Sequence, residues 1–222
     1  MKLLFAILFI GMSCFLFACG NGAIKHNKRG INYAEHDQLT KAVVEFKAAI
    51  RIAPDFAEAH NNLGLAYIEL GKLAEAIVAY TTAIGIDPKN ATAHGGLGLA
   101  YAMQGHLDES IVEFGTAIHI APNYGAEMYN NLGVAYRQQG KLDDSIEKNK
   151  TALSMRPNYA AAHYNLARAY SLKNDKALSI QSLQKAITLN TRFIGLSKTI
   201  RDFDNIRGSS EFQQLVYSSK AD

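Results

Sequence analysis

The four prolines of this chain recur at a nearly constant interval. Pro54, Pro88, Pro122 and Pro157 stand 34, 34 and 35 residues apart. The same interval separates a series of tyrosines and a series of alanines, namely Tyr33, Tyr67, Tyr101, Tyr136 and Tyr170, and Ala49, Ala83, Ala117, Ala152 and Ala186. Because three residue types of unlike chemistry share one period of this length, the sequence predicts a stack of repeated supersecondary units.

Each period predicts two helices. Within residues 57–90, apolar residues recur at helical spacing from Ala57 to Leu70, and again from Leu73 to Ile86. Pro88 ends the second helix, because a proline disfavours the α conformation in the residue before it. Helices of about 14 residues are only marginally stable alone in water. We therefore expect neighbouring helices to stabilise one another by packing.

The turn within each period carries residues that tolerate a left-handed backbone. These residues are Asp37, Gly71, Gly105, Gly140 and Asn174. Glycine adopts this conformation without a Cβ clash, and aspartate and asparagine tolerate it best among the other residues. The pattern predicts that the first helix of every period ends in a left-handed turn.

Glycines also recur in the middle of the first helices. They are Gly64, Gly98 and Gly133. A glycine there costs about 1 kcal/mol relative to alanine, so its repetition indicates that a neighbouring helix comes too close for a side chain. Ala76 and Ala83 of the second helix are the expected small residues on the facing surface.

This pattern of small and large residues, with a proline closing each 34-residue unit, resembles the tetratricopeptide repeat (TPR). The resemblance implies an all-α fold, a TPR α-solenoid in which five helix-turn-helix repeats form a right-handed superhelix. The register places the repeats at 23–56, 57–90, 91–124, 126–159 and 160–192. Gly125 is then a one-residue insertion between repeats, either a simple loop insertion or a kink in the superhelix.

The period stops after residue 192, and residues 193–222 are predicted to form a helical cap. The segments Arg192–Ile200 and Ser210–Tyr217 have the character of two short helices. Their apolar residues suit a cap that covers the open end of the last repeat.

Residues 1–18 are predicted to be a signal peptide. One lysine precedes an apolar run from Leu3 to Phe17, which as a helix would span roughly 22 Å, less than a bilayer core of about 30 Å. The segment Leu16–Cys19 resembles a bacterial lipobox, which implies cleavage before Cys19 and attachment of lipid, palmitate included, to Cys19. Residues 19–22 would be a short lipidated linker. Ordinary secretion and an uncleaved anchor are the alternatives.

A lipobox implies attachment to the bacterial envelope. By the same resemblance, Gly20 after the cysteine favours the outer membrane, facing the periplasm, in a cell with two membranes. In a cell with one membrane the protein would lie on the outer face of the plasma membrane. Cys14 and Cys19 are the only cysteines, so the processed chain is expected to have no disulfide.

Catalysis and metal binding are not expected. The sequence contains no nucleophile elbow, phosphate loop or HExxH motif. Position four of the repeats carries His26, His60, His94, Tyr129 and His163. Helices of neighbouring repeats pack about 8–10 Å apart, whereas ligands of one zinc lie about 2.0–2.1 Å from it. These side chains are therefore predicted to pack or form hydrogen bonds on the packed face, and no cofactor is expected.

The charge of the chain argues against binding to nucleic acid, because the formal net charge is only +3. One basic cluster, Lys25, Lys28 and Arg29, follows the expected lipid anchor closely. This cluster is either a solvated helix start or a contact with anionic lipid headgroups.

The opposite face of the first helices is the expected binding surface. It carries amides at Asn61, Asn62, Asn130, Asn131 and Asn165, and apolar side chains at Leu65, Leu99 and Val134. Amides that both donate and accept, over an apolar floor, suit an extended peptide backbone with apolar side chains. The alternative is that these amides brace neighbouring helices.

The sequence thus favours a non-catalytic, membrane-anchored scaffold that binds a protein or peptide partner in the concave TPR groove. Such a scaffold would assist the assembly of an envelope complex for pili, secretion or the cell wall. A self-associating structural oligomer and an accessory subunit of an envelope enzyme are the alternatives, and the sequence leaves the oligomeric state open.

Overall fold

The structure is a computed structural model that describes residues 21–123 and 125–218. Over these residues it contains helices joined by short turns and no strand. They form two compact units, residues 21–104 and 105–218. The expected signal peptide, Cys14, Cys19 and Gly20 lie outside the described residues. Within the described part, no helix has the length and hydropathy needed to cross a bilayer.

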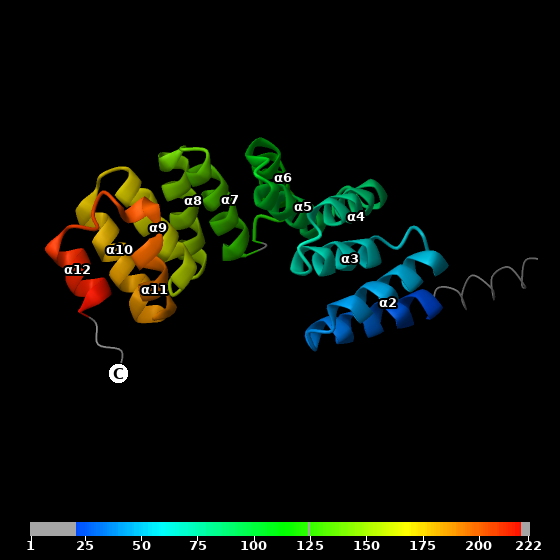
Figure 1. Cartoon of the computed structure of the whole chain (residues 1–222). Coiled ribbons are helices and arrows are strands. Elements are labelled where there is room, and N and C mark those ends of the chain that lie inside the picture. Colours follow the sequence, from blue (N-terminus) through cyan, green and yellow to red (C-terminus); the bar gives the residue numbers. More distant parts are fainter. Residues whose placement is uncertain (1–20, 124, 219–222) are drawn as a thin grey trace, which may run out of the picture. The chain divides into compact units, whose positions relative to one another are not determined.

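The first unit contains five helices. A helix over residues 21–35 is followed by α2 (Leu39–Ile52), α3 (Ala57–Glu69), α4 (Leu73–Ile86) and α5 (Ala91–Gln104). In this unit α3 packs against α2 and α4, and α4 packs against α5 (Figure 1). A single hydrophobic core centred on Phe46, Tyr67 and Tyr80 runs through these helices.

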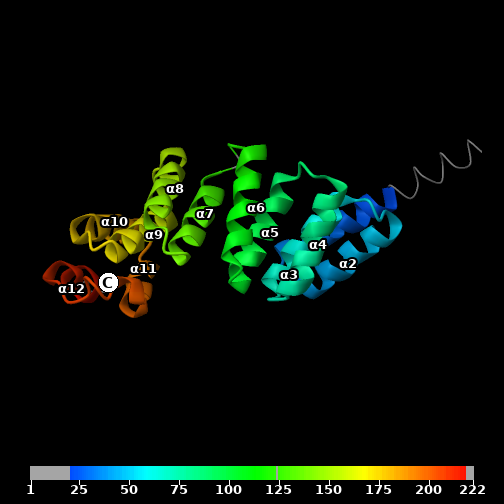
Figure 2. The ribbon, with the colours of Figure 1, turned by 90° about the horizontal axis from the view of Figure 1, so that it is seen from above.

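The second unit continues the helix pairs and ends in the tail. Its elements are α6 (Leu107–Ile120), α7 (Ala126–Gln138), α8 (Leu142–Met155), α9 (Ala160–Leu172), α10 (Lys176–Leu189), α11 (Arg192–Thr199), the 3-10 helix η1 (Arg201–Phe203) and α12 (Ser210–Tyr217). Both views show α9 beside α10, and the tail elements α11 and α12 pack against α10 (Figures 1 and 2). The predicted cap thus forms at this end.

The predicted helices are confirmed to within one residue at each end. The pair predicted at Ala57–Leu70 and Leu73–Ile86 is α3 and α4, of which α3 ends one residue earlier. The tail helix predicted at Arg192–Ile200 ends at Thr199, and the one predicted at Ser210–Tyr217 is α12. Asp87, before Pro88, is extended with φ −128° and ψ 92°, which is the conformation that a following proline favours.

The left-handed turns are confirmed at all five predicted positions, with φ between 56° and 84°. After α3, the N–H of Gly71 donates to the carbonyl of Ile68 at 2.9 Å, and the N–H of Lys72 donates to the carbonyl of Tyr67 at 2.8 Å. This is the Schellman arrangement, which satisfies carbonyls that a helix end leaves free. The carbonyls of Tyr136 and Tyr170 accept the equivalent bonds in their own turns. The periodic tyrosines therefore take part in the turns through their backbone.

The glycine in the middle of α3 is needed because of a side chain of the second helix. A Cβ built on Gly64 would lie 2.9 Å from the ring atoms of Tyr80, and the tyrosine is only 2% exposed. Ala76 and Ala83 are fully buried nearby. The predicted close approach is therefore confirmed, and its main partner is an aromatic ring.

Candidate functional site

The first helix of each repeat contributes one face to the candidate site. The first helices are the helix over residues 21–35, α3, α5, α7 and α9. Within each unit, we call the surface formed by their positions 5, 6, 9, 12 and 13, counted from the first residue of each repeat, the first-helix face. All eight residues predicted to bind a peptide belong to it.

A cavity of about 260 Å³ opens on the first-helix face of the first unit, between the helix over residues 21–35 and α3. Its lining combines apolar residues with an amide and two carboxylates, namely Ile31, Ala34, Glu35, Phe46, Asn62, Leu65, Ala66 and Glu69. Leu65 is 48% exposed. Two predicted residues, Asn62 and Leu65, therefore meet at a real cavity, whereas Leu99 packs against the hydrophobic core.

The amides of this face are hydrogen-bonded to one another between repeats. Asn62 Nδ2 donates to Asn27 Oδ1 at 3.1 Å in the first unit. In the second unit Asn165 Nδ2 donates to Asn130 Oδ1 at 2.8 Å, and both residues are buried. In each pair, position six donates to position five of the preceding repeat. These two pairs therefore brace the helices of neighbouring repeats, which is one of the two roles that the sequence left open for the amides.

The amide series is interrupted at the third repeat. Asn61 Oδ1 is buried and has no hydrogen-bond partner in residues 21–123 and 125–218, because Gly96 occupies the position from which an asparagine would donate. The ring of Tyr80 fills the space beside Gly96. Asn131 lies half-buried in α7 and accepts a long bond of 3.4 Å from Asn130 Nδ2.

The tail covers part of the first-helix face of the fifth repeat, which the sequence did not predict. Asp202 of η1 accepts from Arg137 Nη1 of α7 at 2.6 Å and from Arg168 Nε of α9 at 2.9 Å. Asn205 Nδ2 donates to the carbonyl of Ser171 at 3.2 Å. The tail therefore covers part of this face as well as the end of the repeat. It leaves the side chain of Arg168 18% exposed, whereas the buried Asn165 is not available to a partner.

Aromatic packing holds the tail in place. The ring of Tyr164 stacks on Phe193 with centroids 4.4 Å apart and meets Phe203 edge-on at 5.7 Å. Phe203 and Phe212 are fully buried. Burial of side chains of this size is a major stabilising contribution, so η1 is a fixed part of the second unit.

Comparisons with known proteins decide the family. Models of the TPR repeat match residues 30–71, 64–105 and 135–174, and a second tetratricopeptide-repeat model matches residues 160–192. The chain belongs to the TPR family. TPR proteins mediate protein–protein interactions. The comparison with curated protein sequences gives no significant match.

Solved TPR structures share this fold. PilF of Pseudomonas aeruginosa is 18% identical with a TM-score of 0.68, over 89% of this chain and 97% of that one. MamA from Desulfovibrio magneticus RS-1 is 19% identical with a TM-score of 0.69, over 77% and 96% of the two chains. YrrB, described as a TPR protein with an unusual peptide-binding site, is 19% identical with a TM-score of 0.65, over 80% and 92%. These likenesses show the fold.

The periodic histidines of this TPR chain link consecutive repeats through hydrogen bonds. His60 Nε2 lies 2.9 Å from the carbonyl of Pro54, and His94 and His163 make the same contact with Pro88 and Pro157 at 3.2 and 3.0 Å. A carbonyl oxygen only accepts, so each Nε2 donates. The hydrogen-bonding role predicted for these histidines is confirmed. Among the described residues, no group of three or more His, Cys, Asp or Glu side chains could hold a metal ion.

The fourth repeat makes the same link with a tyrosine. Tyr129 Oη donates to the carbonyl of Pro122 at 3.2 Å, across seven residues rather than six. Gly125 supplies the extra residue and has φ 131° and ψ 159°, a region that is almost restricted to glycine. The longer tyrosine side chain thus accompanies the longer loop.

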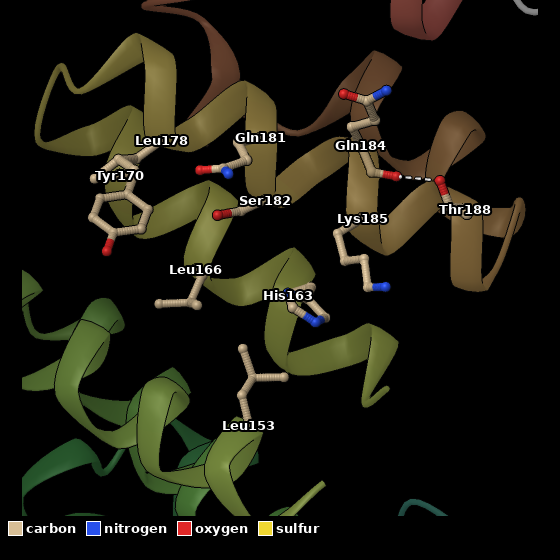
Figure 3. A pocket seen from close by; sticks show the side chains of 10 residues that line it. All are labelled: Leu153, His163, Leu166, Tyr170, Leu178, Gln181, Ser182, Gln184, Lys185 and Thr188. Carbon is tan, nitrogen blue, oxygen red and sulfur yellow. Dashed lines mark hydrogen bonds between the residues drawn. The ribbon is translucent and has the colours of Figure 1, made fainter. Parts of the chain in front are cut away.

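Two cavities larger than the one beside Leu65 lie on the opposite side of the first helices. One of about 540 Å³ is bordered by α8, α9 and α10, and His163, Leu166 and Tyr170 of α9 line it (Figure 3). A matching one of about 460 Å³ in the first unit is lined by His60, Leu63, Tyr67 and Val78. The sequence assigned this face of the first helices to packing alone. Because neighbouring second helices leave a gap, these residues also line open cavities.

Proposed function

We propose that the chain is a non-catalytic, membrane-anchored scaffold that binds an extended segment of a partner protein on its first-helix face. The partner would belong to an envelope complex such as pilus, secretion or cell-wall machinery. The observation that carries the proposal is the mainly apolar cavity beside Leu65, which is open to solvent in a fold whose members bind proteins.

The cavity suits a side chain of an extended segment. Ala34 and Ala66 are small, so the space between Ile31 and the exposed Leu65 is open to an incoming apolar group. Covering an exposed leucine with a partner's side chain contributes on the order of 1 kcal/mol. Because the amides of Asn62 and Asn27 already bond to each other, apolar contact is the main source of affinity at this place.

Two matched variants test the surface. We expect Leu65→Glu to reduce recovery of the partner from envelope extracts by at least about tenfold, since it places a charge in the apolar contact. Val78→Glu makes the same change at a residue of α4 that is 66% exposed on the opposite face, and should leave recovery unchanged. The measurement is quantitative mass spectrometry of co-purified proteins. Equal recovery by both variants would contradict the proposal.

Self-association is the second candidate, and exposed valines on the second helices favour it. Val44 of α2 and Val78 of α4 are 62% and 66% exposed, and Val78 borders the cavity of about 460 Å³. Light scattering of the processed chain distinguishes the two candidates. The scaffold proposal expects the mass of a monomer for both variants, whereas an oligomer that only Val78→Glu dissociates would favour self-association.

Attachment to the membrane is proposed through lipid on Cys19. We expect Cys19→Ser to move the protein from the membrane fraction to the soluble fraction, or to leave an unprocessed precursor, because the acyl chains supply the attachment. Cell fractionation with immunoblotting measures this. A variant of mature size that stays on the membrane would contradict the anchor.

A further inference from the structure

The last two repeats carry excess positive charge on their first-helix face. Arg137 of α7 and Arg168 of α9 both donate to the same oxygen of Asp202, at 2.6 and 2.9 Å. Asp202 is the carboxylate that pairs with these two guanidinium groups among the described residues. The cluster therefore keeps one positive charge that no acidic side chain neutralises.

The cluster also has unused hydrogen-bond donors. Arg137 is only 8% exposed, and its buried Nε has no partner among the residues that the structure describes. Arg168 donates through Nε alone, so its two terminal nitrogens have no hydrogen-bond partner in the described part of the chain. The side chain of Arg168 is 18% exposed, and its terminal nitrogens are not among the buried atoms that lack a partner in the described part of the chain, so solvent reaches them. Donors of charged groups are strongly favoured to find an acceptor.

The position of the cluster fits the end of a bound segment. Val134 and Asn131 lie half-buried on the same face of α7, and Val134 precedes Arg137 by about one helical turn. Beyond α9, residues 202–205 of the tail already occupy this face through Asp202 and Asn205. A segment that follows α7 would therefore meet Arg168 where the open surface stops.

We propose that Arg168, supported by Arg137, forms a carboxylate subsite that takes an acidic group of the extended partner segment. The inference rests on the proposed function, because the partner segment supplies the carboxylate. The two terminal nitrogens of a guanidinium match the two oxygens of a carboxylate. Asp202 already accepts from the remaining nitrogen of Arg168, Nε, through a single oxygen, which leaves both terminal nitrogens for a carboxylate of the segment.

Short peptides test the subsite directly on the processed chain. The probes are N-acetylated, C-amidated Ala-Val-Asp-Ala and its twin with asparagine in place of aspartate. We expect the aspartate peptide to bind about tenfold more tightly, to lose this preference at high salt, and to shift the side-chain Nε–Hε NMR signals of Arg168 and Arg137. Calorimetry and NMR titration provide the two readouts.

Substitutions test which residue produces the preference for the aspartate peptide. Arg168→Gln should abolish the preference for aspartate, and Arg168→Lys should retain part of it, because a lysine keeps the charge without the paired donors. Lys185→Gln removes the same charge from an exposed residue of α10 that lines the opposite cavity, and should leave the preference intact. Circular dichroism melting checks that each variant is folded.

A third probe, Ala-Val-Ala-Ala with a free C-terminus, identifies the source of the carboxylate. If it alone binds and shifts the Arg168 signal, the subsite stands and takes a chain end rather than a side chain. Equal binding of the aspartate and asparagine peptides, with no binding of the third, would overturn the subsite. Loss of the partner in Leu65→Glu would still support the proposed function in that case, so the two failures are distinguishable.

Discussion

Asp202→Ala is expected to lower the free energy of unfolding of residues 105–218 by about 3 kcal/mol. Asp202 is the acceptor for Arg137, whose side chain is 7% exposed. Burial, and then the neighbouring Arg168, lower the pKa of Arg137 to about 10, and Asp202 counteracts both. Without the carboxylate, the guanidinium remains charged at neutral pH and buried without compensation. Chemical denaturation monitored by circular dichroism measures the loss.

Two further variants separate the buried ion pair from a general effect of removing an aspartate. Asp143→Ala removes a carboxylate whose side chain is 86% exposed and pairs with Lys173, so it should cost less than about 1 kcal/mol. In an Arg137→Met background, Asp202→Ala should cost much less than in the native chain, because the buried charge is gone. A loss below 1 kcal/mol for Asp202→Ala in the native chain would contradict the proposed role of the pair.

Gly96→Ala is expected to destabilise the first unit by about 2–3 kcal/mol. A Cβ at this position would overlap the ring of Tyr80. The ring of Tyr80 cannot move away easily, because it also packs closely against Gly64 and is only 2% exposed. Thermal and urea unfolding of the variant measure the effect.

The same substitution at Gly85 is the control with the opposite expected sign. Gly85 lies within α4, and a Cβ built there would have no neighbour within 4 Å. Gly85→Ala should therefore raise the stability by up to about 1 kcal/mol, because alanine loses less backbone entropy in a helix. If the two variants changed stability equally, the close packing around Tyr80 would not explain Gly96.

The sequence predicted those parts of the fold that depend on local conformation. Gly71 permits the left-handed turn that ends α3, and Pro88 disfavours the helical conformation in the residue before it, so these helix ends could be predicted to within a residue. Helical periodicity likewise placed Asn62 and Leu65 on one face. Both residues line one cavity in the structure.

The features of the fold and the site that were not predicted depend on contacts between distant segments. Arg137 and Asp202 are 65 residues apart, and the tail has no repeat register from which their approach could be predicted. Periodicity indicated that His60 faces its neighbours, but the carbonyl of Pro54 as its acceptor depends on the loop between repeats. Periodicity also gives the direction of a side chain and not the spacing of neighbouring helices, so the cavities lined by Leu63 and Leu166 were not predicted.

The proposed scaffold binds its partner on the first-helix face beside Leu65. The most direct measurement is photo-cross-linking in living cells, with a photoreactive amino acid at position 65 in one strain and at position 78 in another. We expect a discrete cross-linked product, of a mass above that of the protein alone, from position 65 and none from position 78. A product from position 78 alone would contradict this expectation.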